Sequence, residues 1–406
     1  MKFRHIIQKS LLAALATVAL GSCDMMTESL DDCPTGLYVN FVYDYNIQRA
    51  DMFKDHVGGL TLYVYDESEH LVASKTMGES QLSKYGSYIH FSEQELAPGH
   101  SYRLMAVAFQ HETLKDTGAK YCLTGNNIGD QWKQFFITLD HQSAASARSG
   151  FAAPVAVTRA AATVSNAAPL DTLWHTLTTI TNPADEQPLQ LAPAMLTPAK
   201  TEYRWLRDGS IKSNGVETVT LISGEPTYAT VSLIRDTKHL NISLREIDEP
   251  EAVNHEDYEV FIIDDNAVLD CENNVVTPSD SIVYRPYAQW TTTYDGNGAI
   301  GVQRSAHYDL MFNRLRYDPS PANNAVLCIR KKSTNQTVAV LNLPQILSEG
   351  RTAYEMNNYQ PQEYLDREYD YRLELFLKGE KWKQLSELYV CIDVLSWAKR
   401  IQFENL

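Results

Sequence analysis

Two short stretches, LYVNFVY at residues 37–43 and LTLYVY at residues 60–65, indicate the fold class. Both are rich in aromatic and β-branched residues, which favour strands over helices. Similar runs continue to the end of the chain, at residues 102–109, 217–222, 229–234, 239–244, 258–263, 325–329, 337–341, 371–377 and 388–395. Many short strands separated by turn signals predict an all-β protein built from β-sandwiches.

Helices and long loops are expected at only a few places. Residues 343–347 form one short predicted helix, and residues 361–368 form another because Pro361 can start a helix. Residues 143–169 are dominated by Ala, Ser, Val and Thr and hold no acidic residue, which indicates an inserted loop. This change in composition predicts an N-terminal domain at 37–185, containing the insertion, and a C-terminal domain at 186–406.

Residues 1–22 are predicted to be a lipoprotein signal peptide. Three basic residues precede LLAALATVAL at residues 11–20, an apolar segment too short to be a stable spanning helix. LGSC at residues 20–23 resembles a bacterial lipobox, in which cleavage between Ser22 and Cys23 follows addition of diacylglycerol to the cysteine thiol. The alternative is an ordinary secretory signal cut near Ser22, which would leave a soluble protein with a free cysteine.

Lipidation at Cys23 predicts a protein held on the outside of a bacterial outer membrane. One acyl chain binds a bilayer only marginally, whereas several chains give stable anchoring. Residues 23–36 would then form a short lipidated tether. The membrane partner is thus expected to be contacted through lipid and not through a spanning helix.

Charge and cysteine content exclude some classes of protein. The net charge of −16 becomes −19 once residues 1–22, with three cations and no anion, are removed. Nucleic acid is therefore not an expected partner, because its binding requires clustered Lys and Arg. Once Cys23 is lipidated five cysteines remain, and an odd number argues against a fully paired disulfide framework. Cys328 and Cys391 lie in apolar strand-like runs and are expected to be buried.

The sequence contains no motif of a known catalytic, cofactor or metal site. A nucleophile elbow, a P-loop, a dinucleotide fingerprint and an HExxH motif are all missing. The densest group of acidic oxygens runs from Asp264 to Glu272. It lacks the spacing of an EF-hand loop, so an Asx-type turn closing a hairpin is favoured over a calcium site. No cofactor, metal or enzymatic activity is predicted.

One long stretch carries a specific resemblance. DCP at residues 32–34, FVYDYN at 41–46 and LTLYVYD at 60–66 closely resemble the FimB-type minor subunits, the membrane-anchoring fimbrial lipoproteins of Bacteroidales type V fimbriae. Further similar stretches are ELAPGHSYRLMAVA at 95–108, LWH at 173–175, YLDRE at 364–368 and VLSWAKR at 394–400. The chain is longer than expected for that family, and Thr176 stands where its members often have Gly.

The resemblance implies two transthyretin-like β-sandwich domains in tandem and a non-enzymatic role at the fimbrial base. The implied function is to anchor a fimbria to the cell surface and to terminate or limit its assembly. The implied partners are the major fimbrial subunit and other fimbrial subunits, joined by β-strand addition. The C-terminal strand is the expected mobile segment, and its strand-exchange candidates are Leu388, Val390, Ile392 and Val394.

Two other functions remain open at this point. A surface glycan-binding lipoprotein would need exposed aromatic residues on one face, and Tyr284, Tyr287 and Trp290 are candidates. An envelope hydrolase is disfavoured by the missing motifs. The sequence does not distinguish an anchor from a tip or other accessory subunit, and it does not identify the major subunit.

Overall fold

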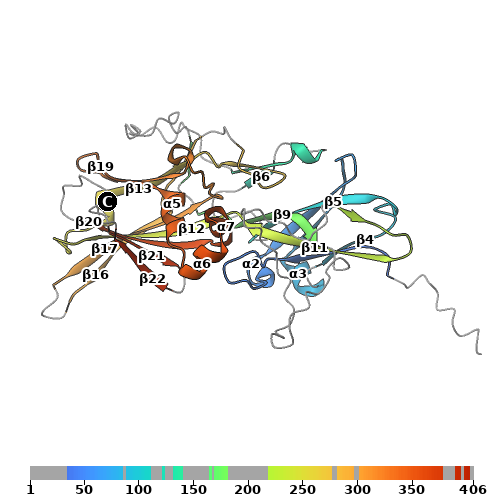
Figure 1. Cartoon of the computed structure of the whole chain (residues 1–406), viewed down its shortest axis with the longest axis horizontal. Helices are drawn as coiled ribbons and strands as arrows, with labels where there is room; N and C mark the ends of the chain where they lie inside the picture. The colour runs from blue at the N-terminus through green and yellow to red at the C-terminus, as the bar shows by residue number, and fades with distance from the viewer. Residues whose placement is uncertain are drawn as a thin grey trace, which may run out of the picture.

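The computed structural model describes residues 34–85, 88–110, 121–123, 131–139, 164–166, 169–181, 218–276, 281–296, 301–377, 389–394 and 397–402. Strands dominate these residues, so the all-β prediction is confirmed, and they form two sandwiches in tandem along the long axis of the molecule (Figure 1). Side chains are described for most, but not all, of these residues.

The N-terminal sandwich is formed by one continuous sheet that folds over on itself. Its strands run in the order β3-β2-β5-β9-β11-β1-β4, with β10 pairing to β5. Its strands are β1 (Gly36–Val42), β2 (Gly59–Tyr65), β3 (Leu71–Gly78), β4 (Tyr88–Phe91), β5 (Ser101–Phe109), β9 (Leu173–Thr181), β10 (Val219–Thr220) and β11 (Pro226–Arg235). Two short helices, α2 (Phe53–His56) and α3 (Glu79–Tyr85), lie in its connections. β1 is parallel to β11 and antiparallel to β4.

This sheet curls so that its two halves share one core. Leu62 of β2 and Leu104 of β5 belong to the same buried cluster as Phe41 of β1 and Val231 of β11. Because successive side chains of a strand point to opposite faces of the sheet, the core residues occupy every second position along each strand. β9 joins the two halves by pairing with β5 on one side and β11 on the other.

The C-terminal sandwich consists of two facing sheets. One has the order β16-β17-β12-β20-β21-β22 and the other the order β19-β18-β13-β15-β8. The strands are β8 (Val164–Asn166), β12 (Lys238–Glu246), β13 (Tyr258–Asp264), β15 (Ile282–Tyr284), β16 (Ala288–Tyr294), β17 (Gln303–Phe312), β18 (Val326–Lys331), β19 (Gln336–Asn342), β20 (Asp370–Leu377), β21 (Tyr389–Val394) and β22 (Trp397–Gln402). We call the six-stranded sheet the large sheet.

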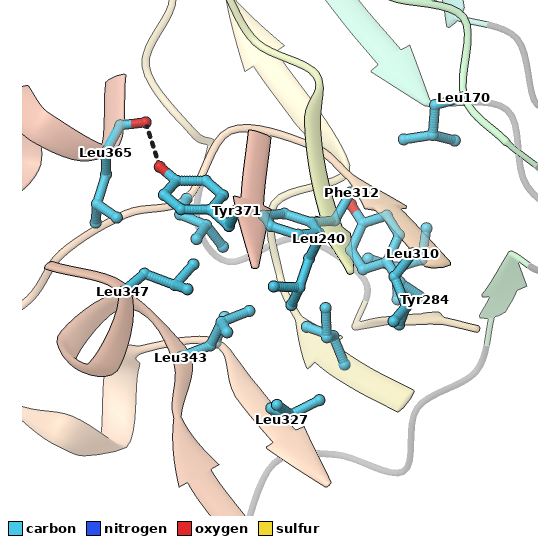
Figure 2. Close-up of a cluster of buried hydrophobic side chains, with 14 of the residues drawn as sticks. Leu170, Leu240, Tyr284, Leu310, Phe312, Leu327, Leu343, Leu347, Leu365 and Tyr371 are labelled. Atoms are coloured by element: carbon cyan, nitrogen blue, oxygen red, sulfur yellow. Dashed lines mark hydrogen bonds between the residues drawn. The ribbon is translucent and has the colours of Figure 1, made fainter. Parts of the chain in front are cut away.

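Both sheets contribute to the C-terminal core. Leu240, Leu310 and Tyr371 of the large sheet lie in one buried cluster with Leu327 and Tyr284 of the facing sheet (Figure 2). The polar end of Tyr371 is satisfied, since its hydroxyl donates to the carbonyl of Leu365 over 3.2 Å (Figure 2).

Three helices follow β19. The two predicted helices are confirmed as α5 (Leu343–Glu349) and α7 (Pro361–Arg367). The expectation of only two helices was too low, because α6 (Ala353–Asn358) lies between them and α2 and α3 lie earlier in the chain. Thr352 and Glu355 form a reciprocal capping box at the start of α6, a signal that the sequence contains.

A small third sheet connects the two sandwiches. It has the order β14-β7-β6, formed by β6 (Tyr121–Leu123), β7 (Phe136–Leu139) and β14 (Val268–Asp270). β6 and β7 fall within the predicted N-terminal domain but pair with a C-terminal strand, whereas β10 and β11 fall beyond residue 186 and pair in the N-terminal sheet. Strand pairing thus divides the chain differently from the predicted division at 185 and 186, because pairing between distant strands leaves no local mark on composition.

Candidate functional site

The two sandwiches meet at a region that we call the joint, centred on the β11–β12 connection Asp236–Thr237 and on α7. Both connecting residues are fully buried. The Thr237 hydroxyl accepts a hydrogen bond from the Leu173 amide at 2.9 Å and donates to the Asp171 carbonyl at 3.1 Å. Asp236 accepts from the side chain of Asn273 at 2.8 Å. The connection is therefore fixed from both sides and is not a flexible linker.

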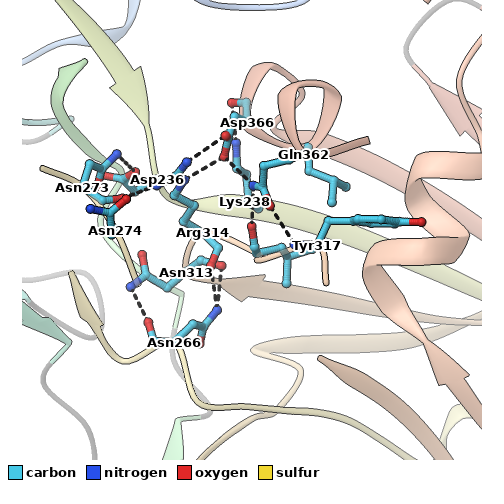
Figure 3. A network of polar contacts seen from close by, with 12 residues as sticks. Asp236, Lys238, Asn266, Asn273, Asn274, Asn313, Arg314, Tyr317, Gln362 and Asp366 are labelled. Carbon is cyan, nitrogen blue, oxygen red and sulfur yellow. Dashed lines mark hydrogen bonds and ion pairs between the residues drawn. The ribbon is translucent and has the colours of Figure 1, made fainter. Parts of the chain in front are cut away.

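Buried charges continue this network into the C-terminal sandwich (Figure 3). Lys238 donates to the carbonyls of Asp366 and Glu368, each at 2.8 Å. Arg314 binds the carboxylate of Asp366 with two hydrogen bonds of 2.7 and 2.8 Å. Burial lowers the pKa of Lys238 and raises the pKa of Asp236. Such bidentate geometry specifies one arrangement of the elements that carry the charges.

Helix α7 also reaches the N-terminal sandwich. The buried guanidinium of Arg367 donates to the carbonyl of Asn46 at 3.3 Å and lies 4.2 Å from the ring centre of Tyr45. A second cross-contact is made by Arg49, which donates to the Tyr359 hydroxyl at 2.6 Å. Two arginines, one from each sandwich, thus hold the loop after β1 against the region around α7.

Aromatic rings fill the rest of the joint. The rings of Tyr43 and Trp174 meet edge to face at 5.8 Å. The guanidinium of Arg235 lies 5.5 Å from the Trp174 ring centre and 4.1 Å from that of Tyr369. Stacking of this kind adds stability when the cation is shielded from water, as Arg235 is.

Three of the stretches that carry the family resemblance meet at this joint. FVYDYN contributes Tyr43, Tyr45 and Asn46, LWH contributes Trp174, and YLDRE contributes the residues around Asp366. Sequence reasoning did not find their partners Lys238 and Arg314, because a lone Lys or Arg in a strand pattern carries no signal of a buried ion pair. These three stretches therefore supply residues on both sides of the contact between the sandwiches.

The predicted strand-exchange residues lie on the large sheet. Val390, Ile392 and Val394 belong to β21, which pairs with β20 on one side and β22 on the other. Leu388, and the predicted lipidation and cleavage residues Ser22 and Cys23, lie outside the described residues. Exchange through β21 would require its separation from both neighbours.

The opposite edge of the large sheet is open. β16 pairs with β17 over seven residues without a register shift, and among the strands described here it has no other partner. Its sequence, AQWTTTY, contains no charge and no proline, and Trp290 and Tyr294 are exposed by 38% and 58%. Natural edge strands are usually protected by charges, proline or bulges. The edge of the facing sheet, β19, does have a register shift against β18.

The aromatic trio Tyr284, Tyr287 and Trp290 does not form one exposed platform. Tyr284 is buried in the core, where its hydroxyl donates to Asn266 at 2.6 Å. Trp290 instead stacks on the ring of His307 at 5.1 Å on the surface of the large sheet. The predicted glycan platform at these three residues is therefore wrong.

The remaining predicted features are structural. Asp270 accepts from the amides of Glu272 and Asn274, so the Asx-turn interpretation is confirmed there. No group of three metal-ligating side chains occurs in the described ranges. Cys328 is buried as expected, with a pKa raised to about 12 by burial, and the Cys391 side chain lies outside the described set. None of the helices traced here is long and apolar enough to cross a membrane.

Comparison with known proteins gives the family. Three solved structures share the fold, though each is under 25% identical to this chain. A candidate adhesin from Bacteroides thetaiotaomicron has a TM-score of 0.63 at 19% identity, covering 91% of this chain and 99% of its own. A candidate polysaccharide-binding protein from the same species has a TM-score of 0.60 at 22% identity, covering 91% and 99%. A candidate adhesin from Bacteroides ovatus has a TM-score of 0.59 at 22% identity, covering 91% of this chain and 96% of its own.

The match to a family model extends over both sandwiches. A search of curated proteins gave no match. The family model described as "Fimbrillin-A associated anchor proteins Mfa1 and Mfa2" matches residues 30–192 and 214–403, which is most of the chain. This confirms the resemblance to a fimbrial anchor family. The chain therefore belongs to the family of fimbrillin-A associated anchor proteins Mfa1 and Mfa2.

Proposed function

We propose that this protein is a lipid-anchored base subunit that holds a fimbria on the outer membrane and limits its assembly. Acyl chains on Cys23 would fix the N-terminal end to the membrane. The C-terminal sandwich would join the major fimbrial subunit by β-strand addition. Membership of an anchor family and the rigid joint between the sandwiches support this role.

The observation that carries the proposal is the position of the open edge. β16 lies at the end of the long axis remote from β4 and the N-terminal sheet (Figure 1). A subunit added there would extend away from the lipid anchor. The unpaired main-chain groups of β16 would supply the hydrogen bonds, and alternate side chains beside Trp290 and Tyr294 would set the fit.

Exchange through Leu388–Val394 is the competing arrangement. It would place the C-terminal strand in a partner, or a partner's strand in its place. Releasing β21 and β22 would break the six-residue pairing of β20 with β21. Addition at β16 breaks no pairing among the described strands, so we favour β16 as the first contact.

Electron microscopy of the native host tests the anchor role. A strain lacking the gene is complemented with the wild type or with Cys23→Ala. We expect detached or abnormally long fimbriae in the deletion strain and with Cys23→Ala, and normal attached fimbriae with the wild type. Normal attached fimbriae with Cys23→Ala would overturn the lipid-anchored role.

A pair of proline variants tests the edge. Along β16, successive amide groups point alternately toward β17 and away from it. One of the two variants Thr292→Pro and Thr293→Pro therefore removes an N–H group that points outward, and the other removes an N–H group that points toward β17. The variant that keeps the wild-type melting temperature is the informative one. We expect it to fail to bind the purified major subunit, whereas unchanged binding would reject β16 as the acceptor.

A further inference from the structure

A second surface, independent of strand addition, lies on the outer face of β4, β1 and β11. Strand register places its side chains in two rows. His90, Tyr38 and Tyr228 form one row, and Tyr88, Asn40 and Thr230 form the other. The Tyr38 ring centre lies 4.2 Å from that of His90, 5.4 Å from that of Tyr228 and 6.2 Å from that of Tyr88.

These side chains surround a hollow. Its volume is about 350 Å³, and it is lined by Tyr38, Asn40, Tyr88, Tyr228, Ala229 and Thr230. Tyr88 and Tyr228 are exposed by 44% and 50%, so two aromatic rings stand in water on either side of Asn40. The Asn40 side chain is exposed and makes no hydrogen bond to the described part of the chain. Exposed rings around an open amide are unusual for a surface that only covers a core.

We propose that this hollow, the tyrosine hollow, binds a neutral sugar. The apolar faces of a pyranose ring can stack on Tyr88 and Tyr228, while the Asn40 amide can both donate to and accept from its hydroxyl groups. The volume lies at the lower end of the range for ligand pockets, which suits one or two sugar units. All six lining side chains are uncharged, so the hollow offers no counter-ion to an acidic or basic ligand.

Two features favour a sugar over the membrane surface. The site is hollowed and not a protruding ridge of aromatics, and the loops beside its first row carry Glu93 and Glu225. Carboxylates at that position would repel anionic headgroups. The hollow also lies close to the start of β1, because His90 contacts the Thr35 carbonyl at 2.8 Å. If Cys23 carries the lipid, the site faces sugars that stand near the cell's own surface.

Binding measurements on the mature chain carrying Cys23→Ser test this site. The probes are immobilised neutral oligosaccharides of glucose, galactose, mannose and N-acetylglucosamine, the polysaccharide released from the host's lipopolysaccharide, and vesicles of phosphatidylethanolamine. We expect binding to at least one glycan probe, weakened at least tenfold by Tyr228→Ala and by Asn40→Ala. Ile222→Ala, which removes an exposed apolar side chain outside the hollow, should bind as the wild type does.

Each outcome decides the proposal. Binding to the lipopolysaccharide sugar alone identifies a self-surface ligand, and binding to the other probes identifies an external one. No glycan binding, or glycan binding unaffected in folded Tyr228→Ala and Asn40→Ala, overturns the proposal. Vesicle binding lost in Tyr228→Ala without glycan binding would reassign the hollow to membrane contact. Melting temperatures within a few degrees of the wild type confirm that the variants fold.

Discussion

The joint and the β16 edge differ in how their polar groups form hydrogen bonds. At the joint, buried charged and main-chain groups form hydrogen bonds between elements that lie far apart in the sequence. At β16, main-chain groups on the outer side pair with none of the described strands, and the strand has no charged residue. The contrast separates a part of the molecule that must keep one geometry from a part that is suited to gain a partner.

Buried charges are a costly way to fix the elements that form the joint. An apolar contact of the same area can be equally stable, because desolvation of charges offsets much of their attraction. The Arg314–Asp366 pair adds direction, because Arg314 can bind both carboxylate oxygens in only one orientation and so fixes α7 on the C-terminal sandwich. From there Arg367 of α7 reaches the N-terminal sandwich. In the proposed anchor role, such a fixed orientation would let the protein transmit tension between the membrane and the filament.

The largest predicted effect is at the joint. Arg314→Met removes the cation bound to the buried Asp366 carboxylate, which then keeps only the hydrogen bond from Gln362. We expect the free energy of unfolding to fall by about 3–5 kcal/mol, measured by urea denaturation. Arg245→Met is the matched control, because Arg245 forms an exposed pair with Glu374 and should cost less than about 1 kcal/mol.

Equal losses in the two arginine variants would contradict the comparison. The double variant Arg314→Met/Asp366→Asn gives a further check. It removes the unpaired charge and should recover part of the lost stability.

The second prediction concerns pH and a group on the large sheet. Burial lowers the pKa of His239, but the nearby carboxylates of Asp309, at 3.6 Å, and Asp370, at 2.7 Å, outweigh burial and raise it to about 9. The folded pKa exceeds the ordinary 6.5, so this stabilisation is complete below about pH 6.5 and is lost as the pH rises through about 9. At ~1.4 kcal/mol per pKa unit, its upper bound is about 3 kcal/mol.

Comparison with His239→Gln isolates this contribution from those of the joint. Lys238 and Asp236 also titrate abnormally, so the wild-type profile alone mixes several groups. We expect the stability difference between the wild type and His239→Gln to shrink between pH 6 and pH 10. A difference that stays constant over this range would mean that His239 is not held in its charged form.

The third prediction concerns the solvent-facing rim of the joint. Arg49→Ala removes the hydrogen bond to the Tyr359 hydroxyl and the stacking of the guanidinium 5.2 Å from that ring. We expect a loss of about 0.5–1 kcal/mol, because Arg49 is exposed and its contact is screened by water. A double-mutant cycle with Tyr359→Phe measures the coupling, and a coupling of zero would show that this cross-contact does not hold the sandwiches together.

The sequence predicted the local features of the fold better than the partners of its elements. Alternation of apolar residues along strands such as Ser101–Phe109 and Pro361 at the start of α7 are local signals, and both elements were predicted. The pairing of β11 with β1, nearly two hundred residues apart in sequence, is decided by packing and was not predicted.

The same limit applies to the candidate sites. The resemblance singles out YLDRE, but the partner of its Asp366 is Arg314, which lies 52 residues earlier and carries no local signal of the pairing. The tyrosine hollow was missed because Tyr38, Tyr88 and Tyr228 come from three separate strands. Tyr284 was wrongly grouped with Trp290 because proximity in sequence does not reveal which face of a sheet a side chain occupies.

The last prediction concerns the open edge at β16 and has the smallest expected change in stability. Tyr294→Lys places a charge on β16, the device by which natural proteins protect an edge strand. Because Tyr294 is 58% exposed, the free energy of unfolding should change by less than about 0.5 kcal/mol. Ile247→Lys adds the same charge to an exposed position just beyond the end of β12, two strands inside the β16 edge, and is the matched control. We expect Tyr294→Lys alone to lose complex formation with the major subunit in size-exclusion chromatography. If both variants bind as the wild type does, strand addition does not use β16, and the Leu388–Val394 strand becomes the arrangement to test.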